Sequence, residues 1–102
     1  MRITATITIV YSCIAASVAW ADDVKDYGEY LSGECTTCHR LDGAESEIPS
    51  IIGWETDAFI ETLGYYKSAE RKNPAMESVA KSLDDEQIIA LAAYFGTLKS
   101  ED

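Results

Sequence analysis

Apolar positions along much of the chain recur with the 3.6-residue period of an α-helix. Three groups follow this period: Val24, Tyr27 and Leu31; Phe59, Ile60, Leu63 and Tyr66; and Ile88, Leu91, Ala92, Phe95 and Leu98. A residue that can cap a helix precedes each group, namely Asp22 or Asp23, Thr56, and Asp84, and Gln87 follows Asp84 at the spacing of a capping box. No segment after residue 21 alternates with the period of a β-strand. The pattern predicts an all-α fold with three main helices.

Two segments between these helices contain residues that interrupt helices. Residues 40–55 carry three of them: Gly43, Pro49 and Gly53. Residues 68–80 contain Asn73-Pro74, a dipeptide typical of turns. We therefore predict two loops, and the apolar residues of the first predict that it wraps over an apolar group: Ile48, Ile51 and Ile52.

The N-terminal segment has the pattern of a secretory signal peptide. Arg2 precedes an uncharged, mostly apolar stretch over 3–18, and residues 19–21 (Ala-Trp-Ala) supply the small-x-small site of a signal peptidase. We predict a cleaved leader at 1–21, a mature domain at 22–102 and a periplasmic location.

Two other interpretations of the leader are weaker. A stable membrane anchor is not expected, because the stretch falls short of the about 20 apolar residues that a bilayer requires. A lipoprotein site at Cys13 is disfavoured by bulky Tyr11 two residues before it.

Composition narrows the class of protein further. The 102 residues are 47% hydrophobic and carry 18 acidic against 8 basic side chains, which excludes a disordered chain and argues against binding nucleic acid. Cleavage after Ala21 would leave 81 residues (102 minus 21), with a formal charge of −11 because Arg2 is lost. A domain of this size often depends on a disulfide, a metal or a cofactor to supplement its core.

The segment Cys35-Thr36-Thr37-Cys38-His39 is the strongest chemical signal. Two thiols three residues apart, followed at once by an imidazole, match covalent attachment of a c-type haem. A zinc site would need four ligands, and a mature chain with two cysteines and one histidine offers few. A redox dithiol usually sits in a βαβ setting, and no strands are expected here.

Met76 is the candidate for the second axial ligand of such a haem. It is the one methionine left after processing, no second histidine exists, and Pro74 restricts the backbone just before it. Core packing is the commoner role of a methionine and remains an alternative. Other donors fit less well. Protonated Lys67, Lys72 and Lys81 cannot coordinate the iron, and ligation by Tyr65 or Tyr66 would give the haem iron very different properties.

Four segments give the mature chain a family resemblance: GEYLSGECTTCHR (28–40), IPSIIGW (48–54), YYKSAERKNPAM (65–76) and LDDEQIIALAAYFGTL (83–98). It resembles the class I cytochromes c, and is similar to the small cytochromes related to cytochrome c4 and to the haem subunit of flavocytochrome c sulfide dehydrogenase. Where many of those relatives carry two haem motifs, this chain has one. The resemblance implies an all-α fold of three main helices and two loops around one covalently bound haem c.

The resemblance also implies roles for individual residues. Cys35 and Cys38 would form thioether bonds, His39 and Met76 would ligate the iron, and the Pro49 carbonyl would accept the imidazole N–H. Apolar residues from the loops and helices would line the porphyrin: Ile48, Ile51, Ile52, Phe59, Leu63, Leu91 and Phe95. The first and last helices would cross near Leu31 and Tyr94-Phe95. Trp54 could donate to a haem propionate or simply pack.

Two axial ligands leave the iron no open position, so we expect an electron carrier and not an enzyme. The expected donor is a sulfur-compound (sulfide or sulfite) dehydrogenase, a flavoprotein or a molybdenum enzyme, and the acceptor another cytochrome or an oxidase. The acidic charge favours a basic docking surface, and Asp42, Glu45 and Glu47 cluster after the haem motif. The alternatives are a haem catalyst or gas sensor in which Met76 is displaced, and a thiol redox or metal site at 35–39.

Overall fold

The computed structural model describes residues 2–9, 14–43 and 47–99, so the interpretations placed on Tyr11, Cys13 and Glu45 fall outside the described residues. The described part contains helices and no strand, which confirms the all-α prediction. The helices are α1 (Ile14–Leu31), α2 (Gly33–Thr36), α3 (Thr56–Lys67), α4 (Pro74–Lys81) and α5 (Asp85–Thr97). None of these helices is long and apolar enough to cross a bilayer.

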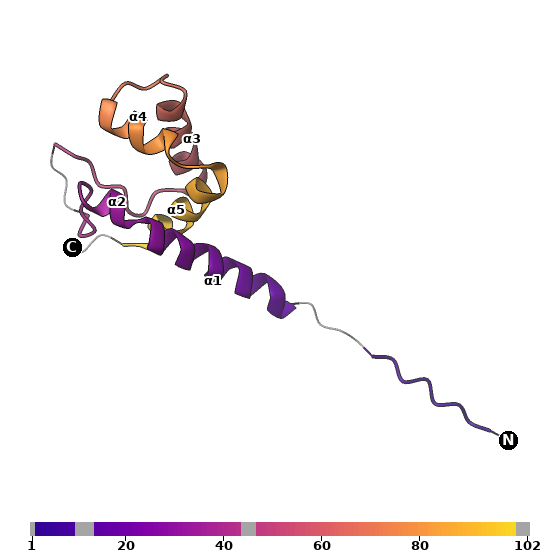
Figure 1. Ribbon diagram of the computed structural model, residues 1–102. Helices are drawn as coiled ribbons and strands as arrows, with labels where there is room; N and C mark the ends of the chain where they lie inside the picture. The colour runs from indigo at the N-terminus through magenta and orange to yellow at the C-terminus, as the bar shows by residue number, and fades with distance from the viewer. Residues whose placement is uncertain (1, 10–13, 44–46, 100–102) are drawn as a thin grey trace.

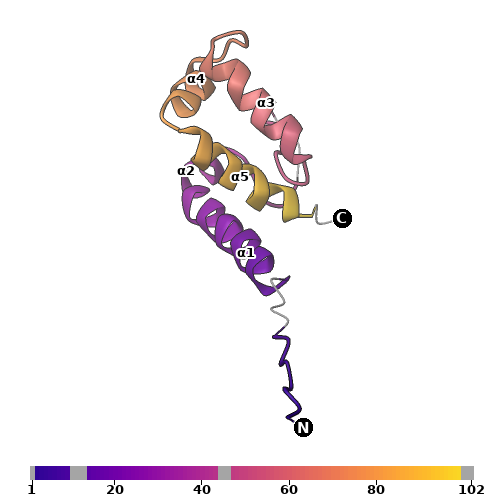
Figure 2. The ribbon, with the colours of Figure 1, turned by 90° about the vertical axis from the view of Figure 1, so that its right-hand side faces the viewer.

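Helix α5 lies at the centre of the arrangement, with α1 along one side and α3 along the other (Figure 1, Figure 2). Its predicted start is confirmed: the Asp84 side chain accepts from the Gln87 backbone at 2.8 Å, and the Gln87 side chain accepts from the Asp84 backbone at 3.0 Å. The apolar stripe of α5 forms the core together with two residues of α3: Phe59 and Leu63. The rings of Phe59 and Phe95 stack with centroids 5.7 Å apart.

The contact between α1 and α5 is made at a glycine. A Cβ atom placed on Gly28 would lie 2.0 Å from the Ala90 carbonyl oxygen and 2.8 Å from the Tyr94 Cβ. No side chain fits in that space, so Gly28 allows the two backbones to approach closely. This crossing places the end of α1, and with it the Cys-x-x-Cys-His segment, against the centre of the fold.

The start of α1 differs from the sequence-based prediction. We expected a cap at Asp22 or Asp23, but α1 begins at Ile14 and runs continuously through the predicted cleavage site after Ala21. Residues 14–21 contain four alanines and neither Gly nor Pro, so nothing in them stops a helix from extending backward.

The second predicted loop also differs. We expected a loop over residues 68–80, but Pro74–Lys81 forms the helix α4. Asn73 caps this helix and Pro74 occupies its first turn. Proline has no N–H to lose at that position, so an Asn-Pro pair can begin a helix as readily as it ends one. In the first predicted loop, the described residues 40–43 and 47–55 belong to no helix, and Gly43 (φ 76°) and Gly53 (φ 72°) take left-handed positions.

Candidate functional site

A cavity of about 310 Å³ lies between the Cys-x-x-Cys-His segment and the helices α3 and α4. Its walls are largely apolar, and seven of the lining residues are aliphatic or phenylalanine: Ile48, Ile51, Phe59, Leu63, Ala75, Val79 and Leu83. Three residues that were also expected at the porphyrin lie in the buried core and do not line the cavity: Ile52, Leu91 and Phe95.

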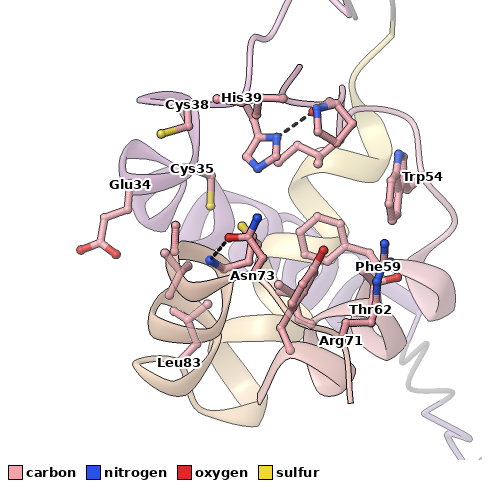
Figure 3. A pocket seen from close by; sticks show the side chains of 18 of the residues that line it. Glu34, Cys35, Cys38, His39, Trp54, Phe59, Thr62, Arg71, Asn73 and Leu83 are labelled. Atoms are coloured by element: carbon pink, nitrogen blue, oxygen red, sulfur yellow. Dashed lines mark hydrogen bonds between the residues drawn. The ribbon is translucent and has the colours of Figure 1, made fainter. Parts of the chain in front are cut away.

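The structure brings all six predicted site residues to this one cavity: Cys35, Cys38, His39, Pro49, Trp54 and Met76. They come from α2 and the turn after it, from the first loop, and from α4. Figure 3 shows the Cys35 sulfur and the His39 ring directed toward the cavity, whereas the Glu34 carboxylate points away from it.

The Cys-x-x-Cys-His segment is shaped by bonds within itself. The His39 N–H donates to the Cys35 carbonyl oxygen at 2.8 Å, and the Cys38 N–H donates to the same oxygen at 3.1 Å. This single helical turn, continuing α2, presents Cys35 and His39 on one side. The two cysteines are free thiols, Cys35 half-buried and Cys38 exposed.

The Cys35 thiol is not poised for thiolate chemistry. Burial, and then the neighbouring Glu34 carboxylate, raise its pKa from 9.0 to about 11. A redox or nucleophilic cysteine needs the opposite shift, toward a thiolate at neutral pH. The environment therefore argues against the thiol-redox alternative.

His39 is buried, with 9% of its surface exposed, and its ring is held by one strong bond. Its Nδ1 lies 2.7 Å from the Pro49 carbonyl oxygen (dashed in Figure 3), and a carbonyl can only accept, so Nδ1 carries the proton. The other ring nitrogen, Nε2, then keeps its lone pair. An imidazole fixed in this tautomer is prepared to bind a metal through Nε2.

Met76 is placed by the first turn of α4. Its backbone N–H donates to Asn73 Oδ1 at 3.0 Å, and the Glu77 carboxylate accepts from the Asn73 N–H at 3.2 Å. The Met76 side chain is half-buried and packs against the core cluster while lining the cavity. The helix cap thus fixes the backbone of a residue that lines the cavity.

Sequence reasoning missed Asn73 and Arg71. Among the described residues that line the cavity, Arg71 is the one Lys or Arg, and its guanidinium carbon lies 5.1 Å from the centroid of the Tyr66 ring. The available signal was the basic pair Arg71-Lys72 just before Asn73-Pro74 in such an acidic chain. Trp54 lines the cavity too, and its ring meets that of Phe59 edge-on at 6.4 Å.

A metal site made of protein ligands alone finds no support in the described part of the chain. There, no group of three or more His, Cys, Asp or Glu side chains is arranged to hold a metal ion.

No family model matches the chain. It is 38% identical over 90 residues to the cytochrome subunit of sulfide dehydrogenase of Chlorobaculum tepidum, covering 86% of this chain and 81% of that protein. It is 38% identical over 87 residues to cytochrome c-553 of Helicobacter pylori, covering 82% and 86%. It is 31% identical over 71 residues to the thiosulfate dehydrogenase electron acceptor of Stutzerimonas stutzeri, covering 67% of this chain but 33% of that protein.

A solved structure shares the fold. Reduced recombinant cytochrome c4 from Pseudomonas stutzeri matches with a TM-score of 0.68 and 23% identity, over 76% of this chain and 50% of that one. An all-helical domain with a Cys-x-x-Cys-His turn and a facing methionine is a cytochrome of the c type, and the relatives show that the chain belongs to the class I cytochromes c. It is an electron-transfer protein with haem c as its cofactor, a carrier and not an enzyme.

Proposed function

We propose that the chain carries one haem c, bound covalently through Cys35 and Cys38, and moves single electrons with His39 and Met76 as the axial ligands. The observation that supports this most directly is the pairing across the cavity. An imidazole with its Nδ1 committed to Pro49 and a thioether on a capped helix line the same apolar space.

The residues present fit this cofactor. The apolar walls suit a porphyrin, the two thiols can each add S–H across a vinyl group, and Nε2 of His39 retains a lone pair. When bound, the haem supplies a one-electron couple. The chain's own part is to hold both ligands in place, exclude water and stabilise the reduced form through a sulfur ligand.

The polar ends of the porphyrin need partners as well. Arg71 offers the one cation among the described lining residues, and Trp54 offers an indole N–H. A guanidinium stacked on Tyr66 is already oriented, so little entropy is lost when it binds a carboxylate. We assign these two side chains to the haem propionates.

We propose the periplasm as the site of action, because residues 1–21 have the pattern of a signal peptide. Export to the periplasm with cleavage after Ala21 would leave α1 starting at Asp22, where acidic side chains suit a helix N-terminus. The Gly28–Ala90 crossing lies beyond the cut and would be kept.

The donor is proposed to be a sulfur-compound dehydrogenase, either a flavoprotein or a molybdenum enzyme, with a cytochrome or oxidase as acceptor. Two relatives bear names of this kind, a subunit of sulfide dehydrogenase and an electron acceptor of thiosulfate dehydrogenase. The acidic surface favours a basic partner and a rate that falls as salt rises.

Haem staining of a denaturing gel tests the proposal. The protein is expressed with the cytochrome c maturation machinery, beside a double variant, Cys35→Ala with Cys38→Ala. We expect a stained band for the unmodified chain and none for the variant. A redox titration of the unmodified protein should fit the transfer of one electron. An unstained band for the unmodified chain would reject covalent haem and restore the thiol or metal alternative.

A further inference from the structure

Helix α4, which carries Met76, has few neighbours. Of the described helices it packs against α3 alone, whereas α3 also packs against α5. Figure 1 shows α4 beside α3, at the far side of the molecule from α1. The position of Met76 relative to His39 therefore depends on how firmly α4 is held on α3.

One side chain makes a polar connection between these parts. Lys67 is the last residue of α3, and its Nζ donates to the Leu83 carbonyl oxygen at 2.6 Å, sixteen residues away in the sequence. Leu83 follows α4 directly after its cap at Ser82, lines the cavity and precedes the cap of α5. Within the described residues this is the one hydrogen bond from a side chain of α3 to the turn between α4 and α5.

Helix α4 is thus fixed at both ends. Asn73 caps its first turn and holds the Met76 backbone, Ala80 is fully buried near its end, and Lys67 binds the turn beyond it. An ammonium-to-carbonyl bond in a half-buried setting is stronger than a bond between neutral groups. Its loss would leave the Leu83 carbonyl without this donor and loosen the end of α4 from α3.

We propose that Lys67 is a positioning residue for the sixth ligand, keeping Met76 at the iron against competing ligands by fastening α4 to α3. This inference rests on the proposed function, because it assumes that Met76 ligates a haem at this site. Lys67 itself is not among the residues that line the cavity.

Lys81 provides the matched control. It lies on α4, in the last turn, and is exposed. Lys81→Met removes a positive charge from the C-terminal end of α4, as Lys67→Met does from the C-terminal end of α3. Both variants therefore lose a similar favourable interaction with a helix dipole. Only Lys67→Met also removes the bond to Leu83.

The test is a titration of the oxidised haem protein with imidazole, followed by the loss of the sulfur-to-iron absorption band. We expect Lys67→Met to bind imidazole about tenfold more tightly than the unmodified protein, since the lost bond no longer favours the Met76-ligated state. Lys81→Met should stay within about twofold, and Lys67→Arg, which keeps a donor, should recover much of the difference. Lys67→Leu, which likewise offers no donor to the Leu83 carbonyl oxygen, carries the same expectation as Lys67→Met should the latter fail to accumulate.

Equal imidazole affinities for the Lys67 and Lys81 variants would overturn the inference while leaving the proposed function intact. Tighter imidazole binding by Lys67→Met than by Lys81→Met, with recovery in Lys67→Arg, would support it, because loss of charge at a helix end alone would change both lysine variants alike. An unmodified protein that lacks the sulfur band would instead reject the proposed function.

Discussion

The two sides of the cavity are built in different ways. On the His39 side, five consecutive residues form one turn, their backbone N–H groups bond to carbonyl oxygens no more than four residues away, and Pro49 fixes the imidazole from ten residues away. On the Met76 side, a separate eight-residue helix carries the proposed ligand and is held by Asn73 and by Lys67. The first side is held mainly by short-range contacts, whereas the second depends on contacts between distant segments, so we expect the second side to be the easier one to displace.

The largest expected effect comes from removing one ligand at a time. Met76→Ala should keep its haem stain, because the thioether bonds lie on the other side, but the reduced protein should now bind carbon monoxide. His39→Ala should lower the yield of haem-stained protein at least about tenfold, because it removes the proposed iron ligand together with the bond to Pro49 that orients it. Gel staining measures the retained haem, and visible spectra measure the binding of carbon monoxide. Equal haem yields from the two variants would contradict the proposed difference between the two sides of the cavity.

The next effect concerns the crossing that supports the His39 side. Gly28→Ala would place a methyl group 2.0 Å from the Ala90 carbonyl oxygen, so the free energy of unfolding should fall by about 3 kcal/mol. Gly64→Ala is the control: it lies inside α3 with nothing within 4 Å of the added Cβ, and should raise stability by about 0.5–1 kcal/mol. Denaturant unfolding followed by circular dichroism checks the pair. Similar values for both would show that the crossing is not tight.

A smaller effect separates two helix caps. Asn73→Ala and Asp84→Ala each remove a side chain that accepts a backbone N–H at a helix start, and each should cost about 1 kcal/mol of unfolding free energy. Only Asn73→Ala should also weaken the sulfur-to-iron band, since only α4 bears a ligand. A band that weakens equally in both variants would mean that the cap does not position Met76.

The smallest effect tests the charge difference between the two sides. Glu34 and Glu47 line the His39 side of the cavity, while Arg71 lies among the residues of the Met76 side. Glu34→Gln should slow reduction by a small cationic reagent by about twofold at low salt. Asp85→Asn, which removes the same charge away from the cavity, is the control, and stopped-flow kinetics measure both. An equal slowing by the two substitutions would assign the effect to net charge alone.

Local signals in the sequence were sufficient to predict the His39 side and α5. The Cys-x-x-Cys-His motif and the Asp84–Gln87 capping box each lie within five residues, so their geometry follows from the chain itself. Met76 was proposed as a ligand by elimination, and the structure places it at the cavity on a helix that was not predicted. Asn73-Pro74 was interpreted as a turn because the same residues can end one helix or begin the next.

Contacts between distant segments could not be predicted. The bond from Lys67 to Leu83 and the place of Arg71 at the cavity depend on the way α3 turns back toward α4. That turn includes Ala69 in the left-handed region (φ 63°), where a glycine would have signalled it and an alanine did not. The backward extension of α1 had no signal either, because a predicted cleavage site is not a helix breaker.

Carbon monoxide added to the reduced, unmodified protein tests most directly whether His39 and Met76 together fill the iron's axial positions. We predict an unchanged visible spectrum, with Met76→Ala as the positive control that does bind the gas. Ready binding by the unmodified protein would contradict the account of an electron carrier and favour a haem catalyst or gas sensor at the same site.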